Sequence, residues 1–432
     1  MTDLRTVRGM RDLMGDEMRV SDYLVSTAVS VFKLFGYEPL DSPAVELWET
    51  LSAKGGEDVE AETFKFRDKG DRDVGLRFDL TVPLARIVAS NPHLPKPFRR
   101  YAIGKVWRYD RPQAGRYREF MQADVDIVGS ASPAADAEVV MVAIEFMERV
   151  FGRDFTVRIN DRKVLRGLTE TVGVPEKYSM ECLRAIDKLE KIGVDEVMQE
   201  LRTRGISESQ AGDILQKITL RGRGEKVIQE MREVVGTSPV GAEGVAELEM
   251  MAQIFHDCGV EDLVEYDMSL ARGLDYYTGP VFEVRYLKKP EIGSVAGGGR
   301  YDHLIERFDG PPTPATGISL GIARLIDAAM SAGLHERVRP VLDAFIAPID
   351  ESMMRHAFRI QRELVRAGLA CEVDMMGRSL KKMLEVADTR RARYVIIVGP
   401  RDIQRGEVSL RDMQTKQTES VPLTGLSDRL RV

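Results

Sequence analysis

Residues 98–129 read FRRYAIGKVWRYDRPQAGRYREFMQADVDIVG, a pattern that predicts two antiparallel strands joined by a charged, glycine-containing loop. Eight basic residues and one acid, Asp110, lie between positions 96 and 118 of a chain whose formal net charge is −7. The basic residues are Lys96, Arg99, Arg100, Lys105, Arg108, Arg111, Arg116 and Arg118. Because guanidinium groups bind phosphate through paired hydrogen bonds, the hairpin predicts a site for a polyphosphate, a nucleic acid, or both.

The second strand of this hairpin alternates strictly between two kinds of residue. One face carries Phe120, Gln122, Asp124 and Asp126, and the other carries Met121, Ala123, Val125 and Ile127. Period two with one apolar face predicts a half-buried strand of an antiparallel sheet. Two interpretations of the polar face stay open: ordinary contact with solvent, or the floor of a site for a cationic ligand beside a phosphate.

The bulk properties predict a globular protein of two to four domains. No apolar run approaches the roughly 18 residues that would suggest a membrane span, and the polar N-terminus predicts no signal peptide. Cys182, Cys258 and Cys371 lie far apart without metal-ligand spacing, which favours a reducing, cytoplasmic location. The net acidity argues against non-specific nucleic-acid binding but allows a local basic face.

The order of patterns along the chain predicts three parts. Residues 166–242 have a helical pattern rich in Glu, Lys, Arg and Leu, and we interpret them as a helical insertion. The segments 1–165 and 243–332 on either side form one sheet domain, and 340–432 alternate strand and helix as a small α/β domain does. Pro43 inside an extended segment predicts an edge that meets another element, such as a second subunit.

Two glycine-containing motifs follow the insertion. LARGLDYYTGPVFEV, residues 270–284, places Arg272, Asp275 and two tyrosines within a few positions, which fits a binding loop or simple turn chemistry. AGGGRYDHL, residues 296–304, has three consecutive glycines, which allow close approach of a ligand but are equally typical of a flexible turn.

Two further motifs lie where a strand is predicted to meet a helix. GISLGIARL, residues 317–325, places Arg324 near a helix start, where phosphate binds readily, although a surface arginine is the simpler interpretation. LRFDLT, residues 76–81, places Asp79 and Thr81 at such a junction, where a helix cap is more common than a ligand contact.

Taken together and in this order, the motifs resemble those of class II aminoacyl-tRNA synthetases, and among these the histidyl-tRNA synthetase family. DRPQAGRYREF resembles the second class II signature, GISLGIARL the third, and the segment ending at Pro43 the degenerate first one. LARGLDYYTG and AGGGRYD resemble the two peptides that mark the histidine enzyme. The resemblance covers nearly the whole chain and implies an α+β class II catalytic domain in the two sheet segments, a helical insertion and a C-terminal anticodon-binding domain.

The resemblance implies that ATP is bound by arginines from separate motifs. Arg108 and Arg272 are implied to approach the α-phosphate from opposite sides, and they are the implied catalytic residues. Arg272 takes a role that other class II enzymes give to a metal ion, so no protein metal site is expected. Arg116 and Arg324 are implied to hold the distal phosphates, and Asp110, where many relatives have Glu, to position ATP. Magnesium is expected with the β- and γ-phosphates.

The resemblance also implies a site for L-histidine. Its residues are Asp79, Thr81, Gln122, Asp126, Arg272, Tyr276, Tyr277 and Tyr301. Asp79, Thr81 and Gln122 are implied to hold the α-amino group, and Asp126, Tyr277 and Tyr301 to contact the imidazole. Asp126 stands where many relatives have the longer Glu.

The implied activity is activation of histidine to histidyl-adenylate and transfer to the 3′ end of tRNA(His) by a homodimer. In-line attack of a carboxylate on an α-phosphorus needs no protein nucleophile, and none is visible in the motifs. One alternative is a histidine-sensing regulatory subunit of an ATP phosphoribosyltransferase, which keeps the core fold without aminoacylation. A second is a synthetase-like domain that senses uncharged tRNA within a longer chain. The four arginines and the basic tail at 376–405 favour the enzyme.

Overall fold

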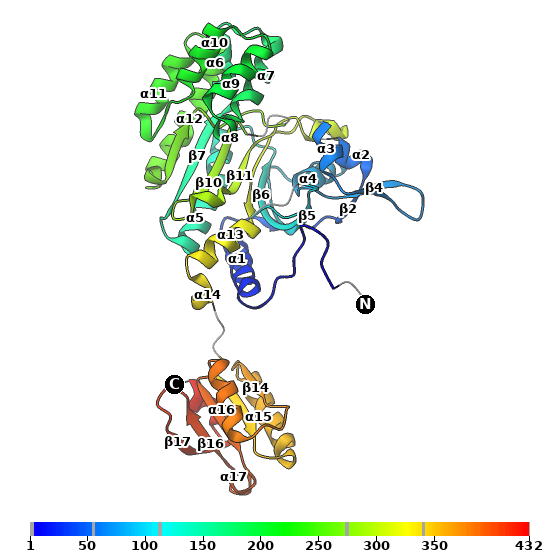
Figure 1. Cartoon of the computed structure of the whole chain (residues 1–432), viewed down its shortest axis with the longest axis vertical. Coiled ribbons are helices and arrows are strands. Elements are labelled where there is room, and N and C mark those ends of the chain that lie inside the picture. Colours follow the sequence, from blue (N-terminus) through cyan, green and yellow to red (C-terminus); the bar gives the residue numbers. More distant parts are fainter. Residues whose placement is uncertain (1–3, 54–56, 111–114, 273–275, 339–341, 432) are drawn as a thin grey trace. The chain divides into compact units, whose positions relative to one another are not determined.

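The structure is a computed structural model that describes residues 4–53, 57–110, 115–272, 276–338 and 342–431 (Figure 1). The chain separates into two compact units, residues 1–338 and 339–432. No helix within these described ranges combines the length and the apolarity needed to cross a membrane.

The first unit is built on a nine-stranded sheet with the strand order β1-β5-β6-β12-β11-β10-β7-β9-β8. Along the chain its strands are β1 (Glu38–Pro39), β5 (Phe98–Trp107), β6 (Glu119–Val128), β7 (Phe155–Asp161), β8 (Arg221–Gly222), β9 (Val264–Asp267), β10 (Pro280–Tyr286), β11 (Ser294–Arg300) and β12 (Ala315–Gly321). All neighbouring strands are antiparallel except the pairs β1–β5 and β7–β9, which are parallel. The predicted antiparallel sheet is confirmed.

The predicted hairpin is formed by β5 and β6, which pair without a shift from Phe98 opposite Val128 to Trp107 opposite Glu119. Arg111 lies in the connecting loop, outside the described residues. The apolar face of β6 is buried under helices α1 (Gly15–Leu34), α5 (Pro133–Phe151) and α13 (Ile322–Ser331) (Figure 1). The side chain of Ser132 accepts a hydrogen bond from the Ala134 amide and so begins α5.

The polar face of β6 differs from its prediction. The strand is buried on both faces, because Gln122, Asp124 and Asp126 are only 8%, 3% and 3% exposed. Phe78, Asp79, Thr81 and Tyr276 line the same cavity as these three residues, so other segments of the chain enclose this face. Alternation along one strand shows that two faces differ, but it does not show what covers each face.

A smaller antiparallel sheet adjoins the first. It contains β2 (Val45–Leu47), β3 (Lys65–Arg67) and β4 (Asp73–Leu76) in the order β2-β4-β3, which confirms the hairpin predicted across Lys69–Asp73. Around it are α2 (Trp48–Ser52), α3 (Glu57–Glu62) and α4 (Thr81–Ser90).

The helical pattern predicted after β7 is observed between Arg162 and Asp257. The helices are α6 (Arg162–Thr171), α7 (Glu176–Ile186), α8 (Leu189–Ile192), α9 (Val194–Thr203), α10 (Glu208–Lys217), α11 (Gly224–Val235) and α12 (Pro239–Asp257). Helices α6 and α12 cross closely, because a Cβ on Gly167 would lie only 2.5 Å from Cα of Gly241. Their buried side chains join the core of the large sheet. The interpretation of residues 166–242 as a separate insertion domain remains a prediction.

The second unit has its own core and a five-stranded sheet in the order β14-β13-β15-β16-β17. Its elements are β13 (Ala344–Pro348), α15 (Met354–Arg366), β14 (Cys371–Val373), α16 (Leu380–Thr389), β15 (Tyr394–Val398), α17 (Pro400–Gln404), β16 (Glu407–Asp412), β17 (Thr418–Pro422) and α18 (Leu426–Arg431). This unit also contains the short helical turn η4 (Glu351–Met353). The remaining short helical segments, in the first unit, are α14 (Leu334–Arg337), η1 (Glu261–Leu263), η2 (Pro290–Ile292) and η3 (Ile305–Phe308).

Candidate active site

A cavity of about 740 Å³ lies over the polar face of β6 in the first unit. All the residues implied to bind ATP or histidine line it, although they come from segments up to 245 positions apart, between Asp79 and Arg324. They are Asp79, Thr81, Arg108, Asp110, Arg116, Gln122, Asp126, Arg272, Tyr276, Tyr277, Tyr301 and Arg324. Asp275 of the same motif lies outside the described residues. A cavity of this size accommodates a nucleotide with a small second ligand.

The bottom of the cavity, which we call the β6 floor, consists of Gln122, Asp124 and Asp126. Except for Arg100, their neighbours on β5 and β12 are small. These neighbours are Gly104 and Gly321 beside Gln122, Ala102 and Ser319 beside Asp124, and Gly317 beside Asp126. The small neighbours leave a trough along β6 in which polar side chains can face a ligand.

Asp126 is held from two sides within the floor. The Nη2 atom of Arg100 lies 2.7 Å from Oδ2 of Asp126, and the hydroxyl of Tyr301 donates to Oδ1. Arg100 is fully buried and also donates to the carbonyl oxygen of Leu80 at 3.0 Å. Burial raises the pKa of Asp126, and the charge of Arg100 opposes this rise.

Asp124 is equally buried, but its negative charge has no ion-pair partner among the described residues like the one that Asp126 has. Burial raises the pKa of Asp124 to about 7, with Arg100 opposing and Asp126 adding to the rise. No described residue forms an ion pair with Asp124, and its Oδ1 atom has no hydrogen-bond partner within the described part of the chain. The sequence pattern placed Asp124 on this face but gave it no role.

Asp79 performs the capping role predicted from its position. Its Oδ1 atom accepts hydrogen bonds from the amides of Thr81 at 3.2 Å and Val82 at 2.9 Å, which fixes the start of α4. Since Asp79 also lines the cavity, capping and ligand contact are compatible here.

Three tyrosines connect the floor with the rest of the cavity. The ring centroid of Tyr276 lies 4.4 Å from that of Tyr277 and 6.3 Å from that of Tyr301. The pKa of Tyr276 is raised chiefly by burial and further by Asp79 and Asp124, whereas Arg108 opposes the rise. Tyr276 therefore lies between the carboxylates of the floor and the arginines.

Arg108, Arg116, Arg272 and Arg324, which we call the arginine cluster, gather at the other end of the cavity. Burial lowers the pKa of Arg324, and Arg116, Arg272 and Arg108 lower it further. Like charges brought together in a partly buried site repel each other unless an anion binds among them.

Each arginine of this cluster is fixed by a separate contact. Arg324 donates from Nη1 to the carbonyl oxygen of Ser294 at 2.7 Å. Arg108 donates from Nε to the carbonyl oxygen of Phe78 at 3.0 Å, and its guanidinium lies 5.3 Å from the centre of the Phe120 ring. Such anchoring aims the remaining N–H groups into the cavity without further loss of side-chain entropy.

Most of the other described basic residues of the hairpin do not contribute to this cluster, so the local count of eight overstates the positive charge that faces the cavity. Among the described members, Arg108 and Arg116 line the cavity. Arg100 lies beside Asp126 on the same face and pairs with it, Arg99 pairs with Glu138 at 2.8 Å, and Lys105 pairs with Glu119 at 2.7 Å. Strand alternation sends successive side chains to opposite faces, so a local count of charge overestimates how many face one ligand.

Glu283 on β10 is a site residue that the motifs did not reveal. It is 5% exposed, and Oε2 lies 3.0 Å from Nε of Arg272. Its other oxygen lies 2.5 Å from Nε of Arg285 and 3.6 Å from Nη1 of Arg158. An acid within the apolar strand PVFEV was the available signal, because a buried carboxylate requires partners.

The three glycines at 297–299 lie within β11, so the flexible-turn interpretation is wrong. A Cβ on Gly297 would collide with Nη1 of Arg272, and one on Gly298 would collide with the carbonyl oxygen of Gly317. Close approach of neighbouring backbone and of Arg272 therefore requires glycine here.

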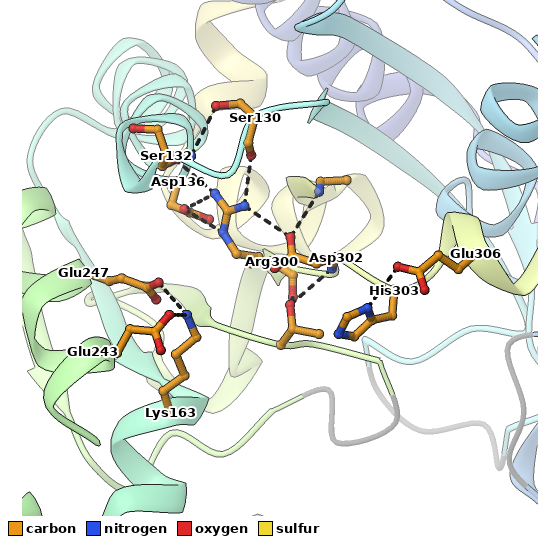
Figure 2. Close-up of polar contacts among 12 residues, drawn as sticks. Ser130, Ser132, Asp136, Lys163, Glu243, Glu247, Arg300, Asp302, His303 and Glu306 are labelled. Atoms are coloured by element: carbon orange, nitrogen blue, oxygen red, sulfur yellow. Dashed lines mark hydrogen bonds and ion pairs between the residues drawn. The ribbon is translucent and has the colours of Figure 1, made fainter. Parts of the chain in front are cut away.

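The motif after these glycines is anchored to the start of α5 (Figure 2). Arg300 donates from Nε to Asp136 at 3.0 Å and from Nη1 to the carbonyl oxygen of Ser130 at 3.0 Å. Asp302 accepts a further bond from Arg300 at 3.2 Å. Tyr301 lies between two residues of this network, which explains how its hydroxyl is held against Asp126.

The lining suits chemistry by positioning and charge. None of the described cavity residues is a histidine or a cysteine, and no described group of three or more metal-binding side chains has the geometry to hold a metal ion. Cationic groups at one end and carboxylates at the other fit an anionic ligand joined to a cationic one.

Comparisons with known proteins agree with this geometry. The family model described as histidyl-tRNA synthetase matches residues 9–325, and the anticodon binding domain model matches residues 343–432. A histidine–tRNA ligase of Aeropyrum pernix is 43% identical over 97% of this chain and 96% of that protein.

Two solved structures are similar as well. A crystal structure of histidyl-tRNA synthetase from Nostoc sp. has a TM-score of 0.86 at 30% identity and covers 100% of this chain and 99% of its own. A Bacillus halodurans structure, titled ATP phosphoribosyltransferase regulatory subunit/histidyl-tRNA synthetase, has a TM-score of 0.77 at 24% identity and covers 92% and 98%, which shows the shared fold alone. The chain therefore belongs to the histidyl-tRNA synthetase family.

Proposed function

We propose that the protein uses ATP to activate L-histidine as histidyl-adenylate and transfers the histidyl group to the 3′ end of tRNA(His). The observation that carries this function is the division of one cavity into an arginine cluster and a carboxylate floor. An ATP molecule with a histidine at its α-phosphate has the matching distribution of charge.

In the activation step, a carboxylate oxygen of histidine forms a bond to the α-phosphorus while the bond to the bridging oxygen of pyrophosphate breaks. Arg108 and Arg272 are the proposed catalytic residues on either side of the α-phosphate, where they stabilise the developing negative charge. Arg116 and Arg324 hold the distal phosphates, and Asp110 positions the nucleotide. The Nε atom of Arg116 lies 3.9 Å from Oδ2 of Asp110, which supports a shared task.

On the amino-acid side, Asp79, Thr81 and Gln122 are proposed to bind the α-ammonium group. Tyr277 and Tyr301 form the ring pocket together with the buried Tyr276, and Asp126 lies beneath Tyr301. A buried polar pocket rejects amino acids that lack the partner groups by about 10⁴–10⁵. Specificity of this kind requires no hydrolytic editing site.

Magnesium is proposed to enter as the MgATP substrate. The carboxylates on the arginine side, Asp110 and Glu283, each already lie beside an arginine. Phosphate oxygens and water would therefore supply most ligands of the ion, which is the usual arrangement for Mg²⁺ at nucleotides. Its contribution is to neutralise the charge of the pyrophosphate leaving group.

The second unit is proposed to bind the anticodon of tRNA(His), and the protein is proposed to act as a cytoplasmic homodimer. Val45, Leu47 and Phe66 on the small sheet are 44%, 48% and 44% exposed, which supports an apolar contact between subunits near the first signature.

The decisive experiment is ATP–pyrophosphate exchange with each of the twenty amino acids in the absence of tRNA. Exchange with histidine alone is expected. Saturable histidine binding without exchange would instead favour the regulatory-subunit alternative, in which the fold senses histidine but does not activate it.

A further inference from the structure

The two carboxylates of the β6 floor differ in the ion pairs and hydrogen bonds that the protein supplies to them. Oδ2 of Asp126 forms an ion pair with Arg100 at 2.7 Å, without the geometry of a hydrogen bond, and Oδ1 accepts from the hydroxyl of Tyr301. Asp124, which is just as buried, has no ion pair, and its Oδ1 atom has no hydrogen-bond partner within the described residues. Burying a carboxylate costs free energy when few groups donate to it. A donor group on a ligand would therefore stabilise Asp124 more than Asp126.

The direction of the two side chains supports this difference. A Cβ on Gly317 would collide with Oδ1 of Asp126, so the carboxyl group of Asp126 lies against the backbone of β12. Asp124 has Ala102 and Ser319 as its neighbours and lines the cavity. Both carboxylates line the cavity, but that of Asp126 is held against β12, whereas Oδ1 of Asp124 has no hydrogen-bond partner within the described residues.

Spacing along the strand gives the same assignment. Alternate residues of a strand lie about 7 Å apart. Under the proposed function, Gln122 is at the α-ammonium group of the bound histidine. The ring nitrogens of histidine lie less than one such step from its α-nitrogen, so they are closer to Asp124 than to Asp126. Asp126 lies one step further.

We propose, on the basis of the proposed function, that the carboxylate of Asp124 accepts the N–H of the imidazole of bound histidine. Asp126 is then a positioning residue that holds Tyr301 and balances the charge of Arg100. This assignment differs from the one implied by the resemblance, in which the acid at position 126 contacts the imidazole.

The charges around Asp124 show why a ligand donor is needed there. The groups that act on it are Arg100 from β5, Asp126 from β6, Asp79 from the segment before α4 and Ser319 from β12. Arg100 is the one cation in this set, and it pairs with Asp126. Burial is the main cause of the raised pKa of Asp124, and Arg100 is the one cation in this set that opposes the rise.

The test compares L-histidine with β-(2-thienyl)-L-alanine, whose five-membered ring has no N–H group. Dissociation constants are measured for the full-length wild type and for Asp124→Asn, which keeps the shape and removes the charge. The variant is expected to lose about 10- to 100-fold in affinity for histidine, as for a charge-assisted hydrogen bond, with unchanged affinity for thienylalanine. Asp124→Ala is the second variant and should show the same selective loss.

Asp161→Asn is the matched control, because Asp161 is fully buried in the same sheet but does not line the cavity. Its affinity for both ligands should equal that of the wild type. Unchanged histidine affinity in the Asp124 variants, or an equal loss for both ligands, would overturn the assignment. Failure of the wild type to bind histidine would overturn the proposed function itself, so the two failures are distinguishable.

Discussion

The Oε2 atom of Glu283 lies 3.0 Å from Nε of Arg272, so a buried carboxylate on β10 fixes an arginine at the edge of the arginine cluster. Glu283→Gln removes this ion pair and should lower kcat for histidine-dependent pyrophosphate exchange by about 10- to 100-fold, because a misplaced catalytic group loses its orientation. Glu265→Gln, on strand β9 of the same sheet and outside the cavity, is the control. Wild-type kcat in the Glu283 variant would show that Arg272 is positioned by other contacts.

Arg324→Met should separate ATP binding from the stability of the free protein. The KM for ATP should rise by about 10- to 100-fold, since a charge-assisted contact to phosphate is lost. Without ATP the variant should melt no lower than the wild type, because Arg116, Arg272 and Arg108 repel the native guanidinium. Melting curves with and without MgATP measure both effects. A full ATP-induced rise in Tm in the variant would exclude Arg324 from the nucleotide site.

The raised pKa of Asp124, about 7, predicts a pH dependence of stability. Between its ordinary pKa near 4 and 7, the folded protein binds a proton at Asp124 that the unfolded chain does not bind. The stability contribution of this group is therefore fully present below pH 4 and is lost as the pH rises through 7. The free energy of unfolding of Asp124→Asn, measured with urea, should exceed that of the wild type at pH 8 and approach it at pH 5.

The same titration predicts a pH dependence of histidine binding. If Asp124 binds the imidazole as a carboxylate, wild-type affinity should weaken as the pH falls below 7. Free histidine itself titrates near pH 6.5, so the profile of Asp124→Asn is the reference. Arg100, Asp126, Asp79 and Ser319 also act on Asp124 and are unchanged in that variant. Identical profiles for the two proteins would contradict the prediction.

Gly298→Ala should damage the sheet at its centre. The added methyl group would collide with the backbone of Gly317 and Ile318, so we expect a loss of more than about 2 kcal/mol in the free energy of unfolding. Gly212→Ala is the matched control, because a Cβ there meets nothing within 4 Å and the residue lies within α10. That variant should gain about 0.5–1 kcal/mol. A neutral Gly298→Ala would show that β11 and β12 can separate without cost.

Asp126→Asn should destabilise the protein, because it leaves the charge of Arg100 buried without its partner. The expected loss is about 3–5 kcal/mol, measured by urea unfolding. Asp154→Asn removes the partner of Lys288 in an exposed pair and should cost less than about 1 kcal/mol. Equal effects of the two substitutions would mean that Arg100 is compensated by other groups.

Much of the first unit could be predicted from local patterns. The period of two in β6, the end of β5 at Trp107 and the helix start at Thr81 are all properties of neighbouring residues, and the structure confirms them. The residues of the cavity were predicted from the resemblance, because no local pattern shows that Asp79 and Arg324 line the same cavity.

The remaining features depend on contacts between segments. Arg100 and Arg108 belong to the same basic stretch, but the first is buried beside Asp126 and the second lines the cavity. Their difference follows from the partner that each meets across β5 and β6 and from the segments that pack on that face. The glycines of β11 show the same limit, because glycine is compatible with both a turn and a crowded strand.

The pairing of β7 with β9 has a consequence for how this fold can change. These strands run parallel and side by side, so the chain passes from Asp161 to Val264 through a long connection, which adds the short strand β8 to the sheet on its way. A parallel pair requires a connection of at least about a dozen residues but sets no upper length. Evolution or protein engineering can therefore lengthen or shorten the helices of this connection while β7 and β9 keep their register, and the losses are the β8 pairing and the cavity contacts of Ile186 and Asp187.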